Sequence, residues 1–142
     1  MYKYLLATTS LLLFSQLSLA DTCPSIDYIK HHSLSGWKIH DSEDGTRLSV
    51  KRMAKFRQLA EQFVLAEWSN NHSQKNAIHC YYRDKNGSDL EAYLTKDAFI
   101  PSANHRYYWY EVSGFLHCAA GMKECEFKHL SQKKLINAKI IS

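Results

Sequence analysis

Short strands separated by turns dominate the hydrophobic and polar pattern of this chain. Residues 37–40 alternate apolar and polar side chains and lead into an acidic, glycine-containing turn at residues 41–45. Residues 77–83 are rich in β-forming side chains, and the Asn-Gly pair that soon follows is a strong hairpin signal. We therefore expect residues 90–94 to be the returning strand of a hairpin.

The last third of the chain predicts further strands. Residues 107–112 and 115–118 predict either a second strand pair or one bent strand with Gly114 at the break. Residues 126–128 predict a short additional strand.

Two segments carry helical spacing. Pro24 suits a first helical turn, and Ile26 and Ile29 follow the helical period, which predicts a short N-terminal helix. Residues 48–68 predict helix or irregular structure in their first half and a strand in their second. Together these patterns predict an α+β fold, a small antiparallel β-sheet with one or two helices, stabilised by disulfides.

Residues 1–20 have the order of a secretory signal peptide. Lys3 supplies an early positive charge, residues 4–14 are apolar, and the polar end of the segment has small side chains at Ser18 and Ala20. The apolar stretch is too short to cross a bilayer as a helix, which takes about 20 residues. We therefore expect cleavage after Ala20 and no stable membrane anchor.

The remaining residues 21–142 have the length of a single globular domain. Of the 18 Lys and Arg only Lys3 lies in the signal segment, so 17 cations stand against 14 acids and the net charge is +3. The cations are spread along the chain, apart from a run at residues 51–57 that is typical of a solvated face. Nucleic-acid binding calls for a denser basic patch in a recognisable module, so we expect no nucleic-acid partner. The product is expected to be periplasmic or secreted.

The cysteines of the exported part are even in number: Cys23, Cys80, Cys118 and Cys125. In an exported chain this favours two disulfides over free thiols or a zinc site. Three pairings are possible. The short glycine-containing link between the last two cysteines can fold as a tight hairpin, which favours Cys118–Cys125 and leaves Cys23–Cys80 as the second bridge.

Recognisable catalytic and metal-binding motifs are absent from the sequence. The 8 His residues include no pair with HExxH spacing, and no carboxylate cluster accompanies them. The His-Cys dipeptides at residues 79–80 and 117–118 suggest a thiol with a base, but strand neighbours point to opposite faces and a disulfide would consume each thiol. The chain also lacks a nucleophile elbow, a phosphate-binding glycine loop and a CxxC pair. We therefore expect no catalytic residues, no metal and no cofactor.

Aromatic residues are the most distinctive feature of the composition, with 9 Tyr, 6 Phe and 3 Trp. In a strand, alternation would send Tyr107 and Trp109 to one face. Tyr108 and Tyr110 would then lie on the opposite face, either exposed or packed under a neighbouring element. Because Tyr is favoured at protein interfaces, Tyr108 and Tyr110 are the predicted partner-binding residues.

Several landmarks of the chain resemble a known family. In chain order these are Cys23-Pro24 after the signal segment, Gly36-Trp37, Phe63-x-x-Ala66-x-Trp68, Cys80-Tyr81-Tyr82 and a late cysteine. The arrangement resembles small exported proteins of Legionella and Coxiella, and among them the EirA family, which is associated with the Dot/Icm type IV secretion apparatus and intracellular replication. The resemblance implies a periplasmic, non-enzymatic accessory protein.

Two functional hypotheses follow. The first is a non-enzymatic periplasmic accessory or binding protein with a protein partner in the envelope, supporting type IV secretion and intracellular replication. The alternative is a small exported enzyme or inhibitor that acts on an envelope or host target. An enzyme would lose activity through one or two polar side chains, whereas a binding protein would lose it through a surface patch.

Signal processing can be tested directly. We predict that N-terminal sequencing of the exported protein reads Asp-Thr-Cys-Pro from Asp21 onward, because the small residues Ser18 and Ala20 precede the cut. A retained Met1 or a lipid on Cys23 would contradict this prediction.

Overall fold

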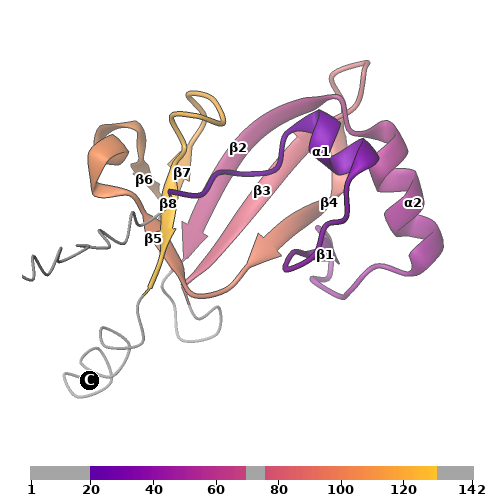
Figure 1. The fold of residues 1–142 in the computed structure, drawn as a ribbon, viewed down its shortest axis with the longest axis horizontal. Coiled ribbons are helices and arrows are strands. Elements are labelled where there is room, and N and C mark those ends of the chain that lie inside the picture. Colours follow the sequence, from indigo (N-terminus) through magenta and orange to yellow (C-terminus); the bar gives the residue numbers. More distant parts are fainter. Residues whose placement is uncertain (1–19, 70–75, 131–142) are drawn as a thin grey trace, which may run out of the picture.

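The computed structural model describes residues 20–69 and 76–130, which form a six-stranded antiparallel sheet beside a two-stranded one (Figure 1). The predicted signal segment lies outside these residues apart from Ala20, so its cleavage stays a prediction. In chain order the elements are α1 (Ile26–His31), β1 (Lys38–Asp41), α2 (Val50–Leu59), β2 (Gln62–Ser69), β3 (Ala77–Arg83), β4 (Asp89–Lys96), β5 (Phe99–Pro101), the 3-10 helix η1 (Ala103–Tyr108), β6 (Tyr110–Val112), β7 (Phe115–Cys118) and β8 (Phe127–His129).

The α+β fold predicted from the sequence is confirmed. The strand order is β1-β4-β3-β2-β7-β6 in the large sheet and β5-β8 in the small one. The predicted hairpin joins β3 to β4 through a turn in which Gly87 adopts a φ of 81°, a conformation that favours glycine. Within the described residues, no helix is long and apolar enough to cross a membrane.

Both α-helices lie against one face of the large sheet, where the core sits. Ile78, Cys80 and Tyr82 alternate along β3 toward this face and are fully or almost fully buried. The ring of Phe56 on α2 packs edge-on against Tyr82, with ring centroids 6.0 Å apart, and Ile29 of α1 is fully buried. The helices therefore bury their apolar residues against β3 and its neighbours.

Each α-helix begins at a serine that caps it. The Ser25 hydroxyl accepts a hydrogen bond from the Tyr28 N–H at 3.1 Å, and the Ser49 hydroxyl accepts one from the Arg52 N–H at 3.3 Å. A serine in this position satisfies one of the backbone N–H groups that the first helical turn leaves without a partner. Pro24 thus precedes the cap of α1 and is not part of its first turn.

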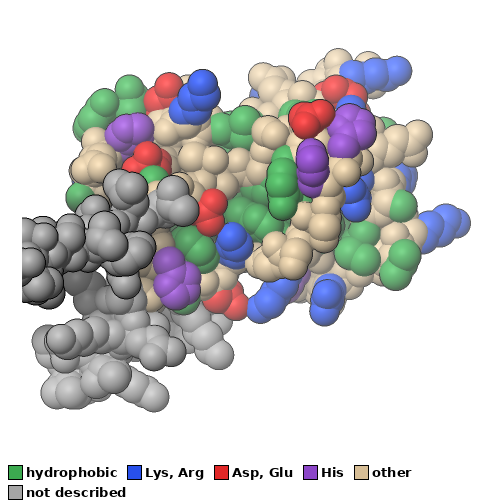
Figure 2. All heavy atoms as spheres, viewed as in Figure 1, with side chains coloured by type: hydrophobic (Ala, Val, Ile, Leu, Met, Phe, Trp, Pro, Cys, Tyr) green, Lys and Arg blue, Asp and Glu red, His purple; other side chains and the backbone are tan. Residues whose placement is uncertain are grey.

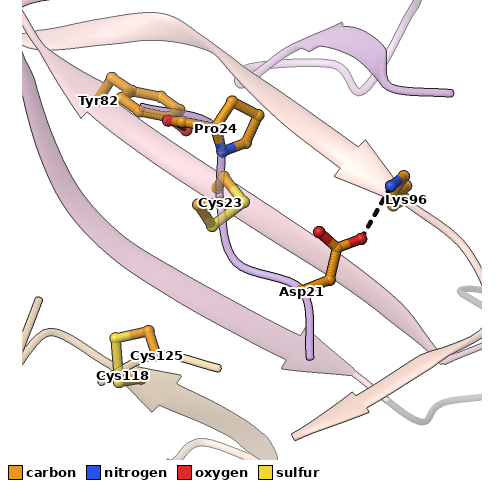
Figure 3. The surroundings of a disulfide bond; sticks show 8 residues. Asp21, Cys23, Pro24, Tyr82, Lys96, Cys118 and Cys125 are labelled. Carbon is orange, nitrogen blue, oxygen red and sulfur yellow. Dashed lines mark hydrogen bonds and ion pairs between the residues drawn. A yellow bond between two sulfur atoms is a disulfide. The ribbon is translucent and has the colours of Figure 1, made fainter. Parts of the chain in front are cut away.

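The pairing predicted for the cysteines is confirmed. Disulfides join Cys23 to Cys80, with 5.8 Å between the Cα atoms, and Cys118 to Cys125, with 5.5 Å between them. Figure 3 shows the first bridge fastening the N-terminal segment onto β3. The second bridge closes the short loop that follows β7.

The N-terminal segment, residues 21–25, crosses the core face of the sheet as an extended strap (Figures 1 and 3). At one end, Asp21 exchanges two backbone hydrogen bonds with Phe127 of β8, at 2.8 and 2.9 Å. Further along, the buried Tyr82 hydroxyl donates a 2.7 Å hydrogen bond to the carbonyl of Pro24. The strap therefore connects the small sheet to α1 across the middle of the large one.

The strand predicted for residues 107–112 is wrong in its first half. Residues 103–108 form the 3-10 helix η1, and the strand β6 begins only at Tyr110. The backbone N–H of Trp109 donates to the carbonyl of Arg106 at 3.2 Å, which ends the helical turn. A short run of bulky residues does not distinguish helical from strand periodicity, so the alternation of side chains did not reveal the helical turn at Tyr107 and Tyr108.

Removing the two disulfides one at a time should have unequal effects on stability. We predict that a Cys23→Ala, Cys80→Ala variant loses about 4 kcal/mol of unfolding free energy, because the bridge closes a long loop, whereas Cys118→Ala, Cys125→Ala loses about 2.5 kcal/mol. Urea denaturation of both oxidised variants measures the difference. A larger loss for the second pair would contradict the prediction.

Candidate functional site

The tyrosine segment lies at one edge of the large sheet. Tyr107 on η1 is 75% exposed and Tyr110 on β6 is 51% exposed, while Trp109 between them is buried in the core. Val112, at the end of β6, is also exposed. Tyr108 is half-buried against the core, with its ring centroid 4.2 Å from that of Tyr107.

These positions confirm part of the prediction and correct the rest. Trp109 is buried and Tyr110 exposed, as the sequence predicts. Tyr107 was expected in the core, but the helical turn of η1 directs it outward, and Tyr108 takes a place against the core instead. The prediction that Tyr108 and Tyr110 bind a partner stays a prediction, and Tyr107 is the exposed aromatic that alternation missed.

The backbone of β6 is open on the side away from β7. The two strands are joined by a two-residue turn at Ser113 and Gly114, with φ of 50° and 85°, and Val112 pairs with Phe115 next to it. The residues that flank a two-residue turn, here Val112 and Phe115, form a hydrogen-bonded pair. In an antiparallel ladder the next residue along the strand points its N–H and C=O away from the neighbouring strand. The N–H and C=O of Glu111 therefore face outward, and no strand among the described residues pairs with this edge.

The opposite edge of the sheet is closed by the chain itself. After β1 the backbone turns back, so that the N–H of Asp41 donates to the carbonyl of Thr46 at 2.8 Å and the N–H of Leu48 donates to that of Ile39 at 3.0 Å. These bonds occupy the outer side of β1. Of the two edges, β6 is thus the one with free backbone groups in the described structure.

A cluster of Glu67, His79 and His117 lies on the sheet face opposite the helices. The strand register pairs Glu67 of β2 with His79 of β3 on one side and with His117 of β7 on the other. One carboxylate oxygen lies 3.2 Å from His79 Nδ1 and the second lies 2.9 Å from His117 Nε2. The Tyr81 hydroxyl donates to the first oxygen at 3.3 Å. One carboxylate thus cross-links three strands.

The Glu67 cluster could not be found from the sequence because its members are far apart in the chain. Glu67 is 12 residues from His79 and 50 from His117, so no local sequence pattern joins this single carboxylate to the two histidines. The repeated His-Cys dipeptide was the available signal. In each strand the cysteine faces the core and the histidine faces the other side, as predicted, and the outward histidines meet at Glu67.

The cluster shifts the pKa of Glu67 and the pKa values of two neighbouring tyrosine hydroxyls. Burial by itself would raise the pKa of Glu67, but the hydrogen bonds and charges of His79 and His117 outweigh it and hold this pKa below its ordinary value. Burial, followed by the charge of Glu67, raises the pKa of the Tyr81 and Tyr93 hydroxyls. The carboxylate form of Glu67 is therefore favoured beside protonated phenols.

The geometry of the cluster suits a structural cross-link. Both oxygens of Glu67 are engaged by protein groups, and the three side chains of the cluster are largely buried. Within the described ranges, no group of three or more His, Cys, Asp or Glu side chains is arranged to hold a metal ion. The cluster fixes β2 between its neighbours and thereby positions β7 and β6.

Comparisons with known proteins identify no relatives of this chain. No protein-family model matches it, and no curated protein or solved structure shows significant similarity to it. The resemblance to the EirA family therefore stays a prediction.

The contribution of Glu67 to stability should depend on pH. Glu67→Gln is expected to lower the unfolding free energy by about 1 to 3 kcal/mol at neutral pH, because charge-assisted hydrogen bonds to two histidines are lost. The folded-state pKa lies below the ordinary value of 4.5. The stability it contributes is thus complete above pH 4.5 and is lost as the pH falls through the folded-state value.

Urea denaturation between pH 7 and pH 3 would measure this dependence. The difference between wild type and Glu67→Gln should shrink toward the acidic end. Glu43→Gln, in an exposed turn, serves as the matched control and should stay parallel to wild type. A constant difference at all pH values would show that the carboxylate charge is not the stabilising feature.

Proposed function

We propose that the protein is a non-enzymatic binding protein of the cell envelope that holds a protein partner at the β6 edge. The observation that carries this proposal is the concentration of exposed apolar surface in residues 107–112. Three of the six large hydrophobic side chains exposed in the described structure, Tyr107, Tyr110 and Val112, lie within this short segment. Exposed apolar side chains gathered at one place mark interaction surfaces, whereas scattered ones need no explanation.

The chemistry of this edge favours an extended segment of a partner protein. A peptide strand can add to an open sheet edge through main-chain hydrogen bonds, while its side chains contact the residues around that edge. Glu111 offers an outward N–H and C=O, and Tyr107 and Tyr110 offer large rings that lose little side-chain freedom on binding. Main-chain pairing would supply the orientation and the tyrosines would act as anchors.

The compartment proposed for this interaction is the oxidising envelope. Two disulfides and no free cysteine among the described residues are typical of exported proteins. The signal-like segment supports export as well. The resemblance to the EirA family supports a partner that belongs to a type IV secretion apparatus.

Truncating the exposed tyrosines should separate binding from folding. We predict that Tyr107→Ala with Tyr110→Ala lowers recovery of the captured partner at least about tenfold, because truncating aromatic interface anchors commonly costs about 1 to 2 kcal/mol or more each. The melting temperature should change by less than about 4 °C, since both side chains are exposed. Affinity capture from the native envelope and thermal unfolding give the two measurements.

The matched control is Tyr28→Ala, because Tyr28 is 41% exposed but lies on α1, away from β6. It should leave capture unchanged.

The role of the backbone is tested by comparing two variants of Glu111. Glu111→Pro removes the outward N–H without touching the β6–β7 pairing, whereas Glu111→Ala keeps this N–H. Normal capture by the double tyrosine variant, or equal capture by the two Glu111 variants, would contradict the corresponding part of the proposal.

A further inference from the structure

A groove of about 700 Å³ lies between α2 and the segment that leads into β1. The lining residues belong to α1, β1, α2 and their connections, and these elements lie at the end of the molecule away from β6 (Figure 1). Its volume is in the range of small-molecule sites, about 300 to 1,000 Å³. The groove is thus separate from the tyrosine segment, and what it binds does not depend on the function proposed above.

One wall of the groove is a stripe along α2. Val50, Met53, Ala54 and Arg57 have the spacing of residues on one helix face, and all four line the groove. Phe56 points elsewhere and is buried against the sheet. This face of α2 is thus apolar at Val50, Met53 and Ala54, ends in the charged Arg57, and borders the core through the half-buried Met53.

The facing wall is also apolar. Leu34, Trp37 and Ile39 line it, the last of them from β1. Val50 at the rim is 79% exposed, the most exposed large hydrophobic side chain in the described structure. Ile39 is already buried in the core and Leu34 and Trp37 are half-buried, so a hydrocarbon tail laid along the groove would cover chiefly Val50 and the exposed parts of Leu34 and Trp37.

The charged groups of the groove have one sign. Lys30, Arg47 and Arg57 are among its lining residues, and no acidic residue is among them. Lys30 forms an ion pair with Glu61 outside the groove. Neither arginine has a carboxylate partner within the described residues, so two uncompensated guanidinium groups accompany the apolar walls.

Arg57 is held in place by backbone carbonyls. Its Nε donates to Ile29 at 2.8 Å and its Nη2 donates to His32 at 2.8 Å and to Lys30 at 3.4 Å. A guanidinium has five N–H groups, so this arrangement leaves donors on Nη1 for a further acceptor. Figure 2 shows Lys and Arg side chains around apolar ones at the α2 end of the molecule.

From these observations we propose that the groove binds a long-chain carboxylate, a fatty acid anion whose tail lies along the α2 stripe and whose head group meets Arg47 and Arg57. The apolar walls match a hydrocarbon tail, and the guanidinium groups match a carboxylate, which Arg47 can bind in bidentate geometry while Arg57 donates from Nη1. An uncharged apolar molecule would leave the charges of the two arginines without a carboxylate partner. A polar anion without a tail would leave the stripe exposed.

Calorimetric titration of the full-length oxidised protein with octanoate, decanoate and dodecanoate, all below their micelle concentrations, tests the proposal. Affinity should rise about fourfold for each CH₂ added, the factor that corresponds to about 0.8 kcal/mol for each buried CH₂. Dodecyltrimethylammonium, which has the same tail and the opposite charge, should bind at least about tenfold more weakly than dodecanoate. Equal binding of the two, or no dependence on chain length, would overturn the proposal.

Variants then locate the site. Arg47→Gln should weaken dodecanoate binding about tenfold or more, because a charge-assisted hydrogen bond is lost, and Ala54→Trp should block the groove. Both residues are exposed, so folding should be retained and is checked by circular dichroism. Lys51→Gln is the matched control, since Lys51 lies on α2 but outside the groove. Unchanged binding by Ala54→Trp, or binding only to anionic phospholipid vesicles, would overturn the proposal.

Discussion

The disulfide between Cys23 and Cys80 is the constraint on which the rest of the structure depends. It fastens the extended segment of residues 21–25 across the core face of the sheet. On one side of that bridge the segment pairs with β8, and on the other side it leads directly into the cap of α1. A short helix such as α1 is unstable by itself, so its position depends on this attachment and on burial of Ile29.

The sheet that the strap secures presents different surfaces at its two edges and on its two faces. A single row of in-register residues crosses the face opposite the helices and includes His79, Glu67, His117 and Tyr110 on four neighbouring strands. The hydrogen bonds of Glu67 hold the middle of this row, and the ring of Tyr110 lies against His117 at its end, 6.2 Å between centroids. Tyr110 at the open edge of β6 is therefore connected through His117 to the strands that Glu67 cross-links.

Local signals in the sequence were sufficient for most elements of the fold. The alternation in residues 37–40, the Asn-Gly hairpin and the short link between Cys118 and Cys125 each depend on neighbouring residues, and each gave the correct structure. Register and contacts between distant segments have no such local signature. For that reason the Glu67 cluster, which joins three strands, could not be predicted. The end of η1, at Tyr107 and Tyr108, was expected to be strand because the aromatic run at residues 107–110 does not distinguish helical from strand periodicity.

The basic run at residues 51–57 shows how tertiary structure changes the meaning of a sequence pattern. The cations alone predicted a solvated face, and Lys51, Arg52 and Lys55 are indeed exposed, whereas Arg57 is half-buried. Arg52 forms an ion pair with Asp41 at 2.5 Å, and Arg57 binds the carbonyls at the end of α1. Because these arginines leave α2 in different directions, the helix contacts both β1 and α1. Another face of the same helix lines the apolar groove. Its positive charge is thus divided between the structural contacts of Arg52 and Arg57 and the exposed side chains of Lys51 and Lys55.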